Sequence, residues 1–208
     1  MLIPIASRKK EMDMEVRACT VLDLKNGHMN SLIQCELFTM MEEDSASKNH
    51  FSALLMPRYV TTLAEMAPLC EVALLHGLND MIIAVEYVHS QNLVHMDIKG
   101  DNIFIDGVGK WLLGDFGSCK FELDDITSFT RYFLPEVLQK AVKSYDWYLL
   151  GVTIVVQLCK SEWKEKLCSS ETSVISHELV IRAARNVAHD PLRKLLLSVF
   201  LRGHMPLN

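Results

Sequence analysis

The chain has 208 residues, of which 50% are hydrophobic and 23% charged, so it can bury a sizeable core in one compact domain or two small lobes. Its 21 Lys and Arg against 26 Asp and Glu give a formal net charge of −5, which predicts no nucleic-acid partner and no anionic membrane partner. The six cysteines stand singly, without metal-ligand spacing, and this is typical of reduced thiols in a cytoplasmic chain, with a nuclear location as the alternative.

The front of the chain predicts one helix followed by two strands. Apolar residues recur at steps of three and four from Lys9 to Leu24, which indicates a helix that Asn26 and Gly27 end. Strands are expected over 30–40 and 51–56, with a polar hairpin loop over 42–49 between them.

The rest of the chain is expected to be mostly helical, with one small hairpin whose turn is Asp106-Gly107. The longest uncharged apolar stretch is shorter than the ~20 residues that a membrane-spanning helix needs, so it predicts a buried helix. The expected elements are a helix over 68–91, hairpin strands over 102–106 and 110–116, a buried helix over 147–159, a charged loop over 161–166, and helices over 177–188 and 191–201.

Residues 95–102 read H-M-D-I-K-G-D-N, and Asp115 begins a D-F-G thirteen residues after Asn102. These residue types suit phosphoryl transfer, which needs a carboxylate for the attacking hydroxyl, a cation near the moving phosphate and oxygen ligands for magnesium. Asp97 would be the base, Lys99 would meet the phosphate, and Asn102 and Asp115 would hold the metal. The hairpin between Asn102 and Asp115 is expected to bring the two ligands to the same end of its strands.

Together these motifs resemble the protein kinase family, with its H-R-D-x-K-x-x-N loop and its D-F-G at the usual interval. Further matches are L-P-E at 134–136 for the family's A-P-E, and H-M-N at 28–30 before the first strand. Asp146 in D-W-Y-L-L-G resembles the Asp that holds the catalytic loop by hydrogen bonds, although it could also be only a helix N-cap. Met56 lies where the family has the gatekeeper of the hinge between its lobes.

The resemblance implies an α+β, two-lobe kinase-like fold with a mostly helical large lobe and an incomplete small β lobe. Residues 1–57 would be a partial small lobe with the regulatory helix and two strands, and 58–208 the large lobe. Glu15 is the best match to the Glu of the regulatory helix, although a solvated helix Glu is an equal interpretation. Lys99, two residues after Asp97, indicates the Ser/Thr class.

The chain also departs from the family pattern. It contains no G-x-G-x-x-G, and Lys9 and Lys10 are too near Glu15 to be the lysine that normally pairs with it. Met96 replaces the Arg of H-R-D, and a thioether cannot bind a phosphorylated activation segment. A truncated gene model, with the rest of the small lobe encoded upstream, would explain the missing glycine-rich loop and lysine without any loss of function.

The leading interpretation is a Ser/Thr protein kinase-like phosphotransferase that uses ATP and Mg²⁺, with a protein substrate as acceptor. Asn102, Asp115, Met56 and Glu15 would contact the nucleotide or its metal. The alternative is an impaired pseudokinase that acts as a binding or scaffold module, and a weaker third candidate is a small-molecule phosphotransferase of the aminoglycoside-kinase type. The sequence leaves the oligomeric state open.

Overall fold

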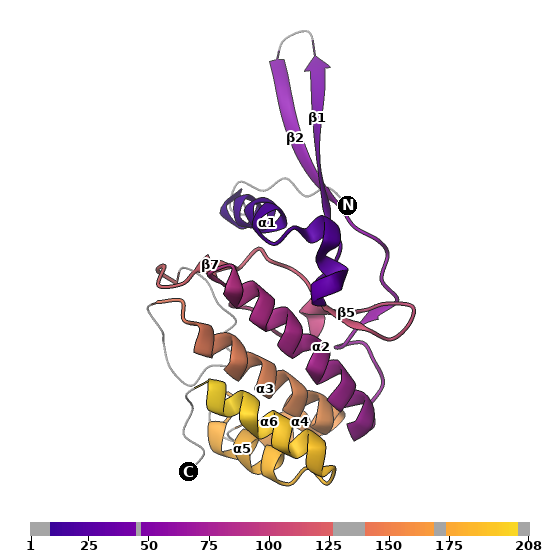
Figure 1. Cartoon of the computed structure of the whole chain (residues 1–208), viewed down its shortest axis with the longest axis vertical. Coiled ribbons are helices and arrows are strands. Elements are labelled where there is room, and N and C mark those ends of the chain that lie inside the picture. Colours follow the sequence, from indigo (N-terminus) through magenta and orange to yellow (C-terminus); the bar gives the residue numbers. More distant parts are fainter. Residues whose placement is uncertain (1–8, 45–46, 127–139, 169–173, 204–208) are drawn as a thin grey trace.

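The computed structural model describes residues 9–44, 47–126, 140–168 and 174–203, and Figure 1 shows a helical body from which a two-stranded ribbon projects. Its 3-10 turns span Leu24–Asn30, Gly100–Asn102 and Lys160–Glu162. The strands are β1 (Glu36–Asp44), β2 (Ser47–Leu55), β3 (Thr61–Thr62), β4 (Leu93–Val94), β5 (Ile103–Ile105), β6 (Trp111–Leu113) and β7 (Lys120–Phe121). The helices are α1 (Lys9–Val21), α2 (Glu71–Ser90), α3 (Lys143–Cys159), α4 (Trp163–Leu167), α5 (His177–Arg185) and α6 (Asp190–Arg202).

The strands β1 and β2 pair with each other from Glu36 opposite Leu55 to Asp44 opposite Ser47. The expected strand over 30–40 is therefore wrong in its first half, because residues 31–33 hydrogen-bond to Leu113 at the edge of the small central sheet instead. The expected loop over 42–49 is also wrong, since the ladder continues through it. A ribbon that pairs with no third strand in the described part of the chain does not need the apolar alternation on which a strand prediction relies.

The helical body is built on α2, α3 and α6, which pack side by side below the ribbon (Figure 1). The expected helix over 68–91 is confirmed as α2, but its buried face is centred on Leu74, Leu78 and Met81, while Leu75 is only half-buried. The α3 helix is buried around most of its circumference, as its uncharged run predicts. No helix in the described ranges is both long and apolar enough to cross a membrane.

The small hairpin is confirmed as β5 and β6, which pair antiparallel with Ile103 opposite Leu113. The β3 strand joins β5 on its other side, and β4 pairs with β7 in a separate two-stranded sheet. The charged loop expected over 161–166 is wrong, because this segment coils into a 3-10 turn and α4. The two last expected helices are confirmed as α5 and α6.

Gly77 lets α2 lie directly against β6, and we expect Gly77→Ala to destabilise the fold. A Cβ at Gly77 would lie 2.1 Å from a ring carbon of the buried Trp111. Gly→Ala inside a helix normally stabilises by about 1 kcal/mol, but overpacking a core costs about 1–3 kcal/mol, so the clash should dominate. Chemical denaturation measures the difference. Gly107→Ala is the control, because nothing lies within 4 Å of its added Cβ, and an equal loss there would contradict the argument.

Candidate active site

The carboxylate of Asp97 is the centre of a hydrogen-bonded loop between β4 and β5. Its Oδ2 accepts from Lys99 Nζ at 2.7 Å and from Asn102 Nδ2 at 3.0 Å. Asn102 Nδ2 also donates to the backbone oxygen of Asp97 at 2.8 Å. The side chain of Asp97 is 11% exposed, so its pairing with Lys99 is only partly screened by water. The structure thus brings three of the predicted site residues together.

Asp146 holds this loop from below. It lies in the first turn of α3 and is fully buried, and its carboxylate accepts from the backbone N–H of His95 at 2.7 Å and of Met96 at 2.9 Å. The predicted hydrogen bonds to the catalytic loop are therefore confirmed. The N-cap interpretation is wrong, because the N-cap of α3 is Val142.

Met96 has a left-handed backbone, with φ of 71°, and its side chain is buried. Such a conformation costs a residue with a Cβ on the order of 1–2 kcal/mol, and the bond from its N–H to Asp146 helps to offset this cost. The thioether therefore belongs to the core and offers no cation at the surface of the loop.

His95 connects the loop to the D-F-G turn. The backbone N–H of Asp97 donates to Nδ1 of His95 at 3.3 Å, so the ring proton lies on Nε2, which donates to Gly114 O at 3.0 Å. The His95 ring also packs edge-on against Phe116, with 5.2 Å between the ring centroids. Both residues are fully buried. The loop and the turn therefore form one packed unit.

The hairpin brings Asn102 and Asp115 to the same end of β5 and β6, as predicted. The N–H of Gly114 donates to Asn102 O at 2.9 Å. Asp115 is the next residue after Gly114, so it lies close to Asn102. Asp115 has a left-handed backbone with φ of 59° and is exposed, and its Oδ1 accepts from Gly117 N at 3.4 Å. Asn102 is buried and both its side-chain bonds use the amide nitrogen, so the carbonyl Oδ1 can serve as a ligand.

Glu15 is half-buried on α1 and lies near Asp115. Burial raises the pKa of the Glu15 carboxyl, and the negative charge of Asp115 raises that pKa further. Met56 follows β2 and is 40% exposed. The L-P-E motif at 134–136 lies outside the described residues.

The raised pKa of Glu15 predicts that Glu15→Gln stabilises the protein at neutral pH. Folding disfavours the ionised carboxylate, so Glu15 lowers stability as the pH rises through and above its ordinary pKa of 4.5. Gln carries no charge, and we expect a gain of less than about 1 kcal/mol, since the carboxyl is partly solvated. Thermal unfolding measured from pH 4 upward should show the variant and the parent converging at acid pH. A gain that is the same at every pH would contradict this assignment.

Two residues that support the site were not predicted from the sequence. Thr153 on α3 hydrogen-bonds to Ile98 O at 3.2 Å and so fixes the middle of the catalytic loop. His89 on α2 lies 2.8 Å from Asp146 through its Nε2. Thr153 is a small polar residue in the mostly apolar run 147–159, and this was a usable signal for it. For His89, the helical periodicity pointed only to an ordinary core position.

A carboxylate, a lysine and an amide on one loop, packed against a D-F-G turn above a helical body, define a protein of the kinase-fold class. The model of the protein kinase domain matches residues 24–194, and the chain belongs to the protein kinase family. Its α+β architecture is that of an incomplete two-lobe kinase, as predicted.

Known Ser/Thr protein kinases resemble parts of the chain. A probable serine/threonine-protein kinase of Dictyostelium discoideum is 37% identical over 81 residues, which are 35% of this chain and 18% of that protein. The human serine/threonine-protein kinase Sgk2 is 32% identical over 124 residues, which are 55% of this chain and 34% of Sgk2. The chain thus matches about a third or less of the length of these relatives.

Solved structures of two other proteins share the fold. ROP2 from Toxoplasma gondii, described as a virulence factor with a protein-kinase fold and no enzymatic activity, superposes with a TM-score of 0.64 at 19% identity, covering 95% of this chain and 63% of ROP2. The kinase PK-1 of the Cydia pomonella granulovirus gives a TM-score of 0.57 at 17% identity and covers 89% of this chain and 72% of PK-1.

Proposed function

We propose that the protein is a Ser/Thr protein kinase that transfers the γ-phosphate of ATP to a hydroxyl of a protein substrate. The observation that carries the proposal is the contact of 2.7 Å between Lys99 Nζ and Asp97 Oδ2. This contact supports the proposal because a carboxylate that can accept a proton and a cation that can bind phosphate lie side by side, an arrangement suited to transfer to a hydroxyl. Asn102 holds Asp97 from the other side and so fixes the direction of its carboxylate.

In this proposal Asp97 orients the substrate hydroxyl and accepts its proton, while Lys99 stabilises the charge on the moving phosphate. Met56 would contact the nucleotide from the segment after β2, and Glu15 would face the phosphates from α1. Protein kinases use ATP with Mg²⁺, and the carboxylate of Asp115 and the amide oxygen of Asn102 are the hard oxygen donors that Mg²⁺ prefers. When bound, the ion would offset the negative charge that gathers on the phosphates.

A second candidate is a pseudokinase that binds partners without transferring phosphate. Two observations favour it: the 208 residues contain no G-x-G-x-x-G, and the neighbouring charge that acts on Glu15 in the described residues is the carboxylate of Asp115 rather than a lysine. The ROP2 structure shows that the fold also occurs in a protein without enzymatic activity.

Asp115→Asn tests the assignment of the metal ligand. Removing the charge of a hard oxygen ligand should weaken ATP binding in the presence of Mg²⁺ by about tenfold or more, while binding in EDTA should not change. Calorimetric titration of ATP, with and without Mg²⁺, measures both values, and transfer of labelled phosphate to a mixture of serine-containing proteins tests the activity. Mg²⁺-dependent ATP binding without any transfer would favour the pseudokinase, and unchanged binding in Asp115→Asn would remove Asp115 from the site.

A further inference from the structure

Two of the six cysteines lie against each other in the fold. Cys19 belongs to the last turn of α1, and Cys35 is the residue before β1. Both side chains are buried, and their thiols hydrogen-bond to each other. Both are free thiols in the structure. Two cysteines that stand singly in the sequence therefore meet as a pair.

The backbone that carries Cys35 is held in place from two sides. The N–H of Cys35 donates to Leu24 O at 3.0 Å, and the N–H of Gln34 donates to the hydroxyl of Tyr59 at 2.8 Å. A disulfide requires two cysteine side chains that already face each other, and the contact between the thiols shows that these two do. The pair therefore has the arrangement from which a disulfide can form.

The two thiols differ in how easily they ionise. Burial raises the pKa of both, and the neighbouring Cys35 and Glu15 help to raise that of Cys19 to about 12. The hydrogen bond between the thiols raises the pKa of Cys19 but lowers that of Cys35, because the Cys19 thiol donates and the Cys35 sulfur accepts. Cys35 is therefore the sulfur that reacts first. Its reaction at neutral pH should be slow, since only the thiolate is strongly nucleophilic.

The position of α1 gives an oxidant a route to the pair. Figure 1 shows α1 beside the base of the ribbon, and its main packing partners in the described part of the chain are the 3-10 turn Leu24–Asn30 and β1. A helix with so few neighbours opens locally more readily than a helix of the buried core. Opening of α1 would admit a small uncharged oxidant to the two sulfurs.

We propose that Cys19 and Cys35 are a modification site, which hydrogen peroxide converts to a disulfide that ties α1 to the start of β1. The Cys35 sulfur attacks the peroxide, breaks its O–O bond and becomes a sulfenic acid, and the leaving hydroxide takes up the thiol proton as water. The Cys19 sulfur then attacks the sulfenic sulfur, and the second oxygen leaves as water with the proton of Cys19. Two thiols are oxidised and one peroxide is reduced to two waters.

The disulfide would also hold Glu15 in place. Glu15 precedes Cys19 by about one helical turn and lies on the same face of α1. A link between residues 19 and 35 closes a short loop and restricts the states in which α1 is open. Oxidation would therefore keep Glu15 near Asp115. The proposal does not depend on phosphate transfer, so it stands or fails separately from the proposed function.

Peptide mapping tests the pair directly. The reduced 208-residue protein is treated with hydrogen peroxide, the remaining thiols are alkylated, and trypsin then places Cys19 in the peptide 18–25 and Cys35 in the peptide 26–48. We expect mass spectrometry to find these two peptides joined, lighter than their sum by two hydrogens, and separated again by dithiothreitol. If distance along the sequence decided the pairing, Cys159 and Cys168 would join first, because fewer residues lie between them.

Hydrogen–deuterium exchange tests the tie between α1 and β1. Oxidation of the parent protein should slow exchange of the α1 amides by about 10- to 100-fold, the range that a disulfide closing a loop of this length gives. Cys35→Ser should lose both the joined peptides and the slower exchange. Cys70→Ser is the matched control and should keep both, because Cys70 is an exposed thiol at the N-cap of α2.

The mapping of the parent protein decides the proposal even where Cys35→Ser fails to fold. Peptides 18–25 and 26–48 that stay separate after peroxide treatment, with both thiols alkylated or oxidised one by one, would overturn it. A joined pair that leaves the exchange of α1 unchanged would show that the disulfide does not restrain the helix, and this outcome would overturn it as well.

Discussion

Asp97→Asn should lower the turnover of phosphate transfer by about 10²- to 10⁴-fold, the usual contribution of a positioned general base. Asn keeps the size of Asp97 and an oxygen that Lys99 and Asn102 can reach, but it cannot accept the proton of the substrate hydroxyl. ATP affinity should stay nearly the same, because Asp97 orients the hydroxyl rather than the nucleotide. Steady-state kinetics together with calorimetric titration of Mg-ATP separates the two effects.

Asp124→Asn is the matched control for this experiment, because Asp124 is an exposed carboxylate in the segment after β7. It should leave both turnover and affinity unchanged. If Asp97→Asn weakens ATP binding as strongly as it slows transfer, Asp97 acts on the nucleotide and the division of roles proposed above is wrong.

Asp146→Ala should have the largest effect on stability, a loss of about 3–5 kcal/mol. The carboxylate is fully buried and bonded to the N–H groups of His95 and Met96 and to the ring of His89. Alanine would leave these buried groups without a partner, at about 1–3 kcal/mol for each unsatisfied group. Urea denaturation measures the loss.

Asp146→Asn gives an intermediate case. It keeps one acceptor oxygen, but it replaces the other with an NH₂ group that would face a backbone N–H, and two donors cannot bond to each other. We expect a smaller loss of stability, together with a loss of transfer where the protein remains folded, since the loop would no longer be held at both N–H groups. A variant as stable as the parent would show that Asp146 does not anchor the loop.

The sequence predicts the local structure of the catalytic loop well, because its residue types and their spacing determine which groups can meet. Asp97, Lys99 and Asn102 lie within one short loop, so their contacts depend on few other parts of the chain. The register that brings Asp115 back beside Asn102 is set by a longer turn than the predicted Asp106-Gly107, because Asp106 N donates to Lys110 O and Gly109 takes the positive φ of 85°. The contacts of the catalytic loop were therefore predictable from a short segment of sequence, whereas the exact turn of the hairpin was not.

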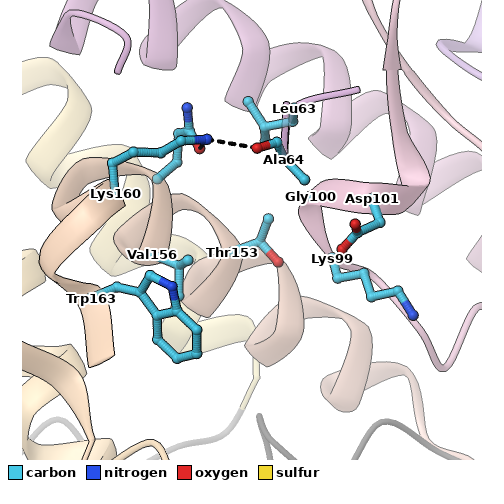
Figure 2. Close-up of a pocket in the computed structure, with 10 residues that line it drawn as sticks. Leu63, Ala64, Lys99, Gly100, Asp101, Thr153, Val156, Lys160 and Trp163 are labelled. Atoms are coloured by element: carbon cyan, nitrogen blue, oxygen red, sulfur yellow. Dashed lines mark hydrogen bonds between the residues drawn. The ribbon is translucent and has the colours of Figure 1, made fainter. Parts of the chain in front are cut away.

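Long-range packing was harder to predict. The contact between Thr153 and Ile98 joins residues 55 positions apart, and that between His89 and Asp146 joins residues 57 apart. The periodicity of a helix shows which of its faces is buried but not which loop that face supports. The cavity beside the catalytic loop (Figure 2) escaped prediction for the same reason, since the loop before α2, the catalytic loop, α3 and α4 line it together only in the folded chain.

The charged segment 161–166 shows a different limit of prediction from composition. Its composition indicates a solvated loop, and most of its side chains are indeed exposed, but Lys160 takes a positive φ of 31° at the end of α3 and a short helix follows. Lysine is not a residue that favours such a backbone, so propensity gives no warning of the turn. Its ammonium bond to Ala64 O helps to offset the strain.

The ribbon of β1 and β2 has a consequence for how the protein opens in solution. In the described part of the chain these two strands pair only with each other, and an isolated two-stranded ribbon is marginally stable in water. Its amide protons should therefore exchange with deuterium much sooner than those of the buried α3 helix. The protein would then hold a closed helical body below a ribbon that opens and closes on its own, so opening of the ribbon need not disturb the hydrogen bonds around Asp97.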